Sequence, residues 1–300
     1  MERELDKYYN KGVAAIDGGN WILALQFFRK CRELDNAFVP AYLEMADIFY
    51  YNGQYEEALK EIKAALLLEP DNMEARFALG NVYISQGRHK EALMVLTRLE
   101  QDSPGFAPEM LYNIGVCYRT LGQQDKALEY FQDAIDDDPS YFECLEMIAK
   151  IHIEAGRLDD AGKALKELIE VDPGHINAHH MLGVVHSKEQ KWKAAIEEWE
   201  TVLSLAPNTD DAMREIGWAL GMSGEYEKAV SALRKAIEMN PHNLQARIDL
   251  GAVFMNNLHF EDAITEWEQA RREDPGNPII KKYLSDAQAQ KKSGEGQGKE

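Results

Sequence analysis

The chain has 300 residues, of which 45% are hydrophobic and 28% are charged, and its formal net charge is -19 at pH 7. A surface this acidic repels phosphate backbones and anionic lipid headgroups, so we expect neither a nucleic-acid partner nor a membrane partner. The N-terminal sequence carries no apolar stretch of the kind that a signal peptide needs, and we therefore expect a cytoplasmic protein.

An alanine recurs along the chain every 34 residues, with one interval of 35. A fixed period of this length indicates one small structural unit that is copied and stacked. We expect a short extension over residues 1–4, a helix over 278–291 that caps the last unit, and a disordered tail rich in Gly and charge over 292–300. The recurring alanines are Ala24, Ala58, Ala92, Ala127, Ala161, Ala195, Ala229 and Ala263, and the units are 5–38, 39–72, 73–106, 108–141, 142–175, 176–209, 210–243 and 244–277.

Each unit contains two helical patterns, which are separated by a turn and are closed in most units by a proline. The first helix carries a Gly or Ala, such as Gly115, and small residues on the two facing helices let the backbones approach closely. A glycine lies in the turn of six units, where it can take the left-handed conformation that ends a helix. Gln190 and Leu258 replace this glycine in the other two units, so we expect those two turns to differ in detail.

The repeat pattern resembles that of the tetratricopeptide repeat (TPR) family over residues 5–277. The resemblance implies an all-α fold, an α-solenoid of eight helical hairpins in a right-handed superhelix with a C-terminal capping helix. It also implies that the first helices line a concave groove and that the second helices form the outer wall. The fourth unit carries the pattern clearly, with Tyr-Asn-Ile-Gly at 112–115 and then Tyr118, Gly122, Ala127, Phe131, Ala134 and Pro139.

The phase of the repeat predicts which first-helix residues point into this groove. In the first four units they are mostly aromatic and aliphatic, which suits an extended peptide or an amphipathic helix of a partner protein. The alternative is that neighbouring helices bury these side chains. In the later units the candidates of a secondary groove are Arg214 and Trp218. The candidate peptide-binding residues are Tyr9, Leu43, Asp47, Tyr50, Tyr51, Phe77, Asn81, Ile84, Tyr112, Asn113, Val116 and Arg119.

The resemblance also suggests one specific ligand, the C-terminal carboxylate of a chaperone, which some TPR proteins hold with basic and Asn residues on three successive first helices. Asn81 and Asn113 match the two asparagines, but Phe77, Glu143 and Met147 stand at three of the basic positions. Because the Glu143 carboxylate would repel another carboxylate, we expect no such clamp.

Motifs of catalysis are not apparent, since the sequence has no phosphate-binding loop, no nucleophile elbow and no HExxH. His175, His179 and His186 share a helix face and weakly suggest a zinc site. The favoured alternative is that His179 and His186 replace the Tyr and Leu of other units as packing residues. We therefore expect no metal, no cofactor and no enzymatic activity.

The sequence thus predicts a non-catalytic scaffold or adaptor that holds a partner protein in its groove. Two other functions remain open: a structural scaffold that assembles with itself through its repeat ends, and an accessory subunit of a separate enzyme. A shared fold does not choose among them, because folds of this kind serve many unrelated pathways.

Overall fold

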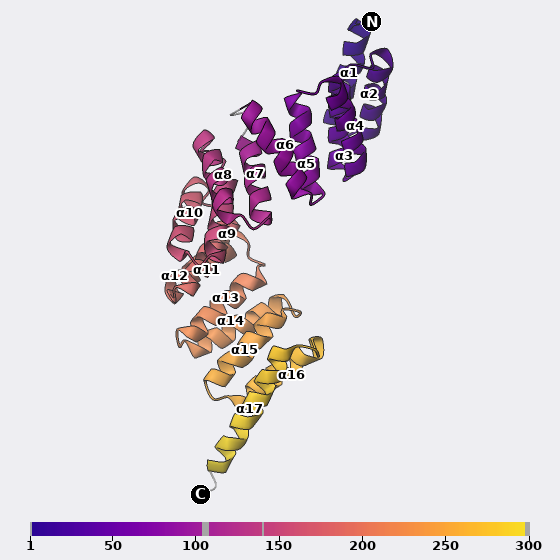
Figure 1. The fold of residues 1–300 in the computed structure, drawn as a ribbon. Helices are drawn as coiled ribbons and strands as arrows, with labels where there is room; N and C mark the ends of the chain where they lie inside the picture. The colour runs from indigo at the N-terminus through magenta and orange to yellow at the C-terminus, as the bar shows by residue number, and fades with distance from the viewer. Residues whose placement is uncertain (1, 104–107, 140, 298–300) are drawn as a thin grey trace. The chain divides into compact units, whose positions relative to one another are not determined.

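The computed structural model describes residues 2–103, 108–139 and 141–297, which form seventeen helices and contain no strand (Figure 1). The predicted all-α fold is therefore confirmed. The helices are α1 (Glu2–Asp17), α2 (Trp21–Leu34), α3 (Val39–Tyr51), α4 (Tyr55–Leu68), α5 (Met73–Ser85), α6 (His89–Asp102), α7 (Pro108–Thr120), α8 (Gln124–Asp137), α9 (Glu143–Glu154), α10 (Leu158–Val171), α11 (Ile176–Lys188), α12 (Trp192–Leu205), α13 (Asp210–Met222), α14 (Tyr226–Met239), α15 (Leu244–Asn256), α16 (Phe260–Glu273) and α17 (Pro278–Gln297).

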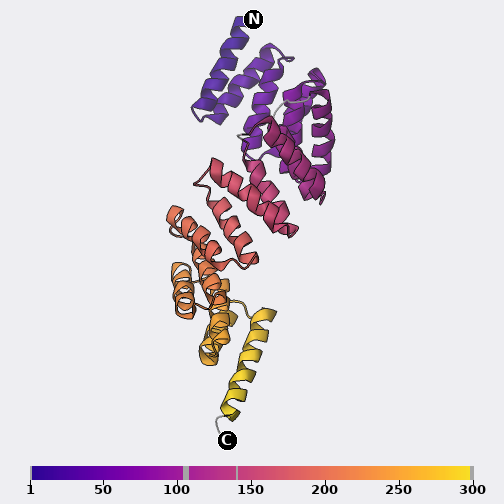
Figure 2. The ribbon, with the colours of Figure 1, turned by 90° about the vertical axis from the view of Figure 1, so that its left-hand side faces the viewer.

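The chain divides into two compact units, which we call unit 1 (up to Cys144) and unit 2 (from Leu145). Within each unit consecutive helices pack as hairpins, such as α3 with α4 in unit 1 and α13 with α14 in unit 2 (Figures 1 and 2). The second helix of a hairpin also packs against the first helix of the next one, as α4 does against α5. This stacking of hairpins within each unit is that of an α-solenoid.

Small residues explain why the two helices of a hairpin approach so closely. All eight recurring alanines are fully buried. A Cβ built on Gly115 of α7 would lie 2.7 Å from Cε1 of Phe131 on α8, and a Cβ on Gly217 would lie 2.6 Å from Cγ of Leu233. Since no real Cβ sits that close to a neighbour, Phe131 and Leu233 on the second helices fill the space that the missing Cβ leaves.

The turns between paired helices share one backbone conformation, and here the expectation for two of them was wrong. Gln190 has a φ of 60° and Leu258 a φ of 65°, close to the 71° of Gly53. Leu258 N–H donates to the Met255 carbonyl and His259 N–H to the Phe254 carbonyl, as Gly53 and the residue after it do in their own turn. These hydrogen bonds require a residue with left-handed backbone dihedrals at this position. Gln190 and Leu258 therefore adopt that backbone conformation despite its steric strain.

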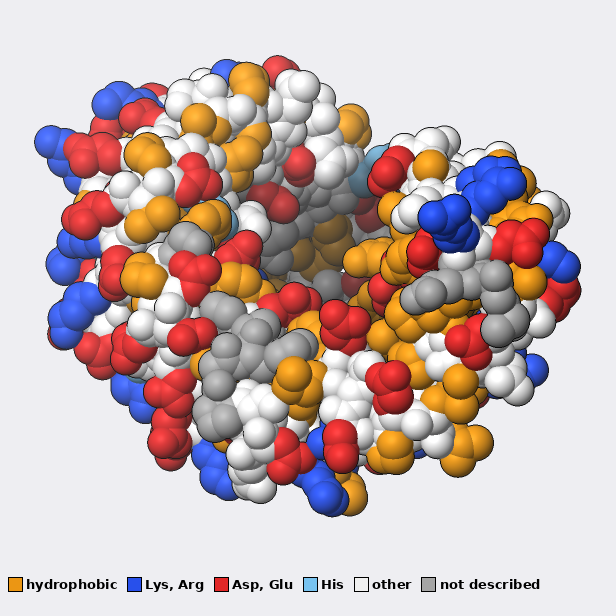
Figure 3. All heavy atoms as spheres, turned by 90° about the horizontal axis from the view of Figure 1, so that it is seen from above, with side chains coloured by type: hydrophobic (Ala, Val, Ile, Leu, Met, Phe, Trp, Pro, Cys, Tyr) orange, Lys and Arg blue, Asp and Glu red, His pale blue; other side chains and the backbone are white. Residues whose placement is uncertain are grey.

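The outer surface reflects the acidic composition. Asp and Glu side chains are spread over the face seen in Figure 3, between patches of hydrophobic side chains. Among the helices that the structure describes, none combines the length and the apolar character that crossing a bilayer would require.

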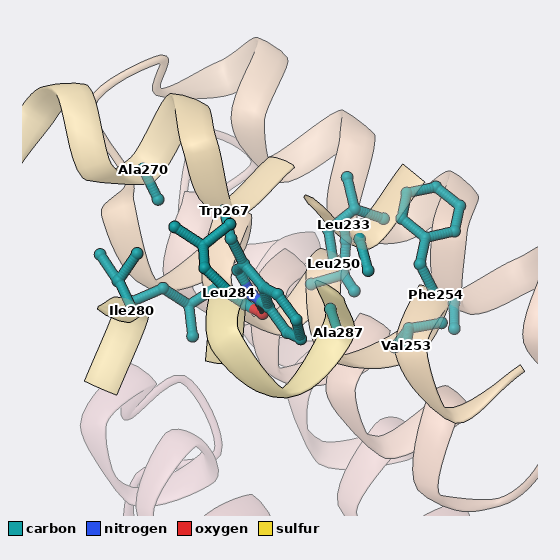
Figure 4. Packing of buried hydrophobic residues seen from close by; sticks show 12 residues of the cluster. Leu233, Leu250, Val253, Phe254, Trp267, Ala270, Ile280, Leu284 and Ala287 are labelled. Atoms are coloured by element: carbon teal, nitrogen blue, oxygen red, sulfur yellow. Dashed lines mark hydrogen bonds between the residues drawn. The ribbon is translucent and has the colours of Figure 1, made fainter. Parts of the chain in front are cut away.

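The helix α17 covers the apolar face of the last hairpin. Ile280, Leu284 and Ala287 are buried against Trp267 and Ala270 of α16 (Figure 4). This contact removes the apolar face of α16 from solvent.

The predicted end of this capping helix was too early. α17 continues past residue 291 to Gln297, over residues that we expected to be a disordered tail, while residues 298–300 lie outside the described part of the chain. Residues 288–292 are good helix formers with no proline to end the helix. In addition, Lys291 Nζ lies 2.8 Å from Glu261 Oε1 of α16.

Candidate functional site

A cavity of about 380 Å³ opens on the first helices of unit 1. We call it the unit 1 groove; it is lined mainly by α3 and α5, with Glu109 of α7 at its edge. It brings together six of the predicted peptide-binding residues. They come from α3 and α5, where their positions in the repeat place them on the helix face that is turned toward the cavity. These six are Leu43, Asp47, Tyr50, Tyr51, Phe77 and Asn81.

Aromatic side chains form one wall of the unit 1 groove. The rings of Tyr50 and Tyr51 meet edge to face with centroids 5.5 Å apart, and the Tyr50 ring also packs against Tyr55 of α4 at 5.8 Å. Ser85 Oγ donates to the Tyr50 hydroxyl at 3.1 Å, which fixes this ring further. Tyr51 remains 77% exposed. A rigid ring therefore backs an accessible one, which is an arrangement suited to an incoming side chain.

Three carboxylates also line the unit 1 groove. Asp47, Glu74 and Glu109 all face the cavity. Water reaches Asp47, but protein surrounds it on most sides, and this desolvation, with the nearby charges of Glu44 and Glu74, raises the pKa of Asp47 to about 6. The groove is therefore strongly electronegative at neutral pH.

Sequence reasoning missed Glu74 and Glu109. Both are second residues of their helices, where acidic side chains are common because they complement the helix dipole, so neither stood out. They nevertheless share one repeat position, and following that position through successive units is the signal that could have found them.

The other six predicted groove residues do not line this cavity. Tyr9 donates its hydroxyl to Glu44 Oε1 at 2.7 Å and packs its ring on Phe28 and Phe38. The Tyr112 ring packs on Phe131 and Tyr141. Asn113 Nδ2 donates to Asn81 Oδ1 at 2.9 Å and so positions a residue that does line it. The remaining three, Ile84, Val116 and Arg119, are partly buried elsewhere on α5 and α7.

Unit 2 has its own concave surface around Trp218. Cavities of about 360 and 550 Å³ share Trp218 of α13, Ala252 of α15 and Tyr283 of α17 as lining residues. The other predicted residue, Arg214, donates from Nη1 to Asp249 Oδ2 at 2.9 Å and also pairs with Glu215. Its charge is therefore neutralised inside the protein rather than held ready for a ligand.

The three histidines considered as zinc ligands each contact different partners. His175 Nδ1 accepts from the backbone N–H of Ala178 at 3.1 Å, and His179 lies 2.7 Å from Glu198 through Nδ1 and 3.1 Å from the Pro173 carbonyl through Nε2. His186 Nδ1 is 3.3 Å from Glu189. The structure does not bring these three rings around one point, and no group of three or more potential ligands converges elsewhere among the described residues.

Comparison with known proteins identifies the family. A profile of the TPR class, described as the "Cilia and flagella-associated protein 70 C-terminal domain", matches residues 63–293, and a tetratricopeptide repeat profile matches residues 39–82. The chain belongs to this TPR family. Proteins built from TPR units generally act as non-catalytic scaffolds for protein interactions, so the coarse prediction of an interaction scaffold is supported.

Individual relatives match only part of the TPR chain. The Photosystem I assembly protein Ycf3 of Rippkaea orientalis is 33% identical over 118 residues, which are 39% of this chain and 63% of that protein. The CTR9 homolog of Arabidopsis thaliana is 27% identical over 135 residues, which are 45% of this chain and 12% of that protein. Both matches thus cover less than two thirds of the relative's length.

A solved structure extends the likeness of the fold. A tetratricopeptide repeat protein from Parabacteroides merdae superposes with a TM-score of 0.59, over 83% of this chain and 98% of that structure, at 18% identity. An identity this low shows a common fold and says nothing about a common ligand.

Proposed function

We propose that the chain is a protein-binding scaffold that holds an extended segment or an amphipathic helix of a partner protein in the unit 1 groove. The single observation that carries the proposal is the cavity of about 380 Å³ with the exposed Tyr51 on its wall. Concave sites with aromatic walls and a few placed polar groups are the usual binding sites of proteins.

The stacking of the helices supports binding without rearrangement. α3 and α5 are each fixed by a paired second helix, so the groove residues are positioned before a partner arrives. The partner then bears most of the cost of becoming ordered, and the exposed aromatic side chain supplies a large share of the affinity. The amide of Asn81, held by Asn113, is placed to bond the partner's backbone.

The relatives are consistent with this role. Ycf3 is named an assembly protein, a description that fits a scaffold holding other polypeptides. We extend that role to this chain as part of the proposal.

A random peptide library displayed on phage tests the proposal when it is selected against the full chain. We expect a set of peptides that bind the wild type and bind Tyr51→Ala, Phe77→Ala about tenfold more weakly or worse. Met94→Ala is the matched control, because Met94 is an apolar side chain that is 74% exposed on the second helix α6. A library that yields no peptide sensitive to the double variant would reject the proposal, provided that its circular dichroism matches the wild type.

Self-assembly is a second candidate function, which one observation favours. Trp21, Ile22 and Leu23 at the start of α2 are all exposed, so the first hairpin presents consecutive apolar side chains to solvent. Exposed large apolar side chains of this kind are a feature of interaction sites. Light scattering over a concentration series tests it: a mass that rises with concentration in the wild type and not in Ile22→Ser is the expected result if the chain associates through this hairpin.

A further inference from the structure

We infer that the unit 1 groove selects a segment carrying a lysine or arginine, whose cationic side chain is received by Asp47, Glu74 and Glu109. The inference rests on the proposed function, because it names the chemistry of the segment that the same groove binds. It is carried by the cavity and by the charges that line it.

The lining of the cavity is the first step. It contains the three carboxylates and no Lys or Arg. Among the described residues, neither an ion pair nor a hydrogen bond reaches the side chain of any of the three. The only acidic neighbour on α3, Glu44, is already engaged by the Tyr9 hydroxyl. A positive charge entering the cavity therefore meets three carboxylates that nothing in the described protein neutralises.

Several basic residues of unit 1 pair with carboxylates outside the groove. Glu61 pairs with Arg32 at 2.7 Å, Asp102 with Arg76 at 2.7 Å, and Glu91 with Arg88 at 3.0 Å. All three of these pairs lie outside the cavity lining. Arg32, Arg76 and Arg88 thus compensate carboxylates elsewhere, and none of the three lines the cavity.

The aromatic wall suits the rest of such a side chain. The side chains of Tyr50, Tyr51 and Phe77 line the same cavity as the carboxylates. A lysine or arginine can lay its aliphatic stem against apolar surface while its charged head interacts with ring faces and carboxylates. Asn81 then bonds the backbone beside it, since its Oδ1 is occupied by Asn113 and its Nδ2 has no partner among the described residues. This combination favours a cationic side chain over an apolar one.

Two other ligand chemistries fit less well. A phosphorylated or acidic segment would add negative charge to three uncompensated carboxylates. A bare divalent cation requires several ligands around one point, and within the described residues no group of three or more potential ligands meets that requirement.

Proton binding by Asp47 should make the binding of a cation depend on pH. The charged groups that act on it are Glu44 on its own helix and Glu74 on α5, while Glu109 of α7, Tyr50 and Tyr51 line the same cavity. Since the pKa of Asp47 is about 6, its carboxylate is largely charged at pH 7.5 and largely neutral at pH 5. The loss of one of the three negative charges should therefore weaken binding of the cation as the pH falls through 6.

The peptides from the selection described above test the inference. We expect those that depend on Tyr51 and Phe77 to be enriched in Lys and Arg over the unselected library. For the tightest of them, replacing its Lys or Arg by Gln should weaken binding to the wild type about tenfold in a fluorescence titration. The same replacement should change binding to Asp47→Asn, Glu74→Gln by less than about twofold.

The control variant is Asp137→Asn, which removes one carboxylate from the exposed surface of α8 in the same unit. It should keep the tenfold preference, which separates the groove from the general acidity of the chain. Groove-dependent peptides that are neutral or acidic, or a preference that survives in Asp47→Asn, Glu74→Gln, would overturn the inference and leave the proposed function standing. A library without any groove-dependent peptide would overturn both.

Discussion

The concave surfaces of the two units are built alike but use their charges differently. Asp47 in unit 1 and Trp218 in unit 2 occupy the same position of the repeat. Asp47 faces a cavity without a cationic partner, whereas Asp249 beside Trp218 is buried, accepts from Arg214 at 2.9 Å and from Gln245 Nε2 at 2.7 Å. A carboxylate that is already paired within the protein cannot attract a cationic ligand. The unit 1 surface therefore keeps carboxylates that a ligand can use, whereas the carboxylate of Asp249 in unit 2 is neutralised by Arg214.

Removing the internal pair of unit 2 should have the largest effect on stability. Asp249→Ala leaves the partly buried guanidinium of Arg214 with Glu215 as its close partner and with Asp211 Oδ1 at 4.0 Å from Nε, and we expect a loss of about 3 kcal/mol in the free energy of unfolding. Hydrogen exchange at the amides of α13 and α15 measures it locally, because stacked repeats need not unfold together.

Asp47→Ala is the matched change in unit 1, and it should cost nothing because no ion pair is broken. The double variant Arg214→Met, Asp249→Leu should recover most of the stability by replacing the pair with apolar side chains. Equal losses for Asp47→Ala and Asp249→Ala would erase the contrast between the two surfaces.

Overpacking a hairpin should show that the scaffolds of the two units are equivalent. Gly251→Ala in unit 2 places a Cβ 2.3 Å from Nε1 of Trp267, and Gly115→Ala in unit 1 places one 2.7 Å from Phe131. We expect each to lower the free energy of unfolding by about 1–3 kcal/mol in urea titrations. Gly251→Ala should be the costlier of the two, because Trp267 Nε1 also donates to the Ile248 carbonyl at 3.0 Å.

Gly162→Ala on α10 controls for the effect of alanine itself. Its Cβ would come no closer than 3.9 Å to Val185, so the substitution should stabilise the helix by about 0.5–1 kcal/mol. If Gly115→Ala and Gly251→Ala did not lower the free energy of unfolding either, the small residues would not be needed for close packing of the paired helices.

The turns offer a smaller test of the same equivalence. Leu258 in unit 2 holds a φ of 65° although it is 72% exposed, so Leu258→Gly removes strain while giving up little packing. We expect a gain of about 1 kcal/mol in the free energy of unfolding. Gly53→Leu introduces the same strain at a φ of 71° in unit 1 and should cost about as much, as thermal unfolding of the two variants can show. Changes of the same sign would mean that the two turns are not alike.

The fold was largely predictable from the sequence, and the site only in part. The 34-residue period predicts paired helices and fully buried alanines, because those properties depend on spacing within one unit. The shared turn conformation escaped prediction, since Gln190 and Leu258 do not favour it and only the hydrogen bonds of the turn impose it.

The groove itself depends on how three helices meet. The repeat phase indicated Asp47, Tyr51 and Asn81, but it could not show that the Tyr9 and Tyr112 rings pack against other aromatic side chains. Rotamers and contacts between neighbouring units decide that, and a pattern within one unit does not contain them. The unpaired state of the three carboxylates has the same origin, because pairing is a property of the assembled surface.

The smallest effect should come from the charge of Asp47, and its sign follows from its pKa. The folded protein raises this pKa from the ordinary value of 3.8 to about 6, so the native state binds the proton more tightly than the unfolded chain does. The contribution of protonated Asp47 to the free energy of unfolding is therefore fully present below about pH 4, and it is lost as the pH rises through 6. Asp47→Asn removes that dependence.

Thermal unfolding of the wild type and Asp47→Asn should accordingly coincide near pH 4, with the variant melting slightly higher at pH 7.5. Asp137→Asn, which removes an exposed carboxylate of α8, is the control for the loss of a surface charge. A constant offset between the wild type and Asp47→Asn at every pH would show that the carboxylate is already solvated or compensated. In that case Asp47 would carry its charge at no desolvation cost, and the contrast with the Arg214–Asp249 pair of unit 2 would rest on Glu74 and Glu109 alone.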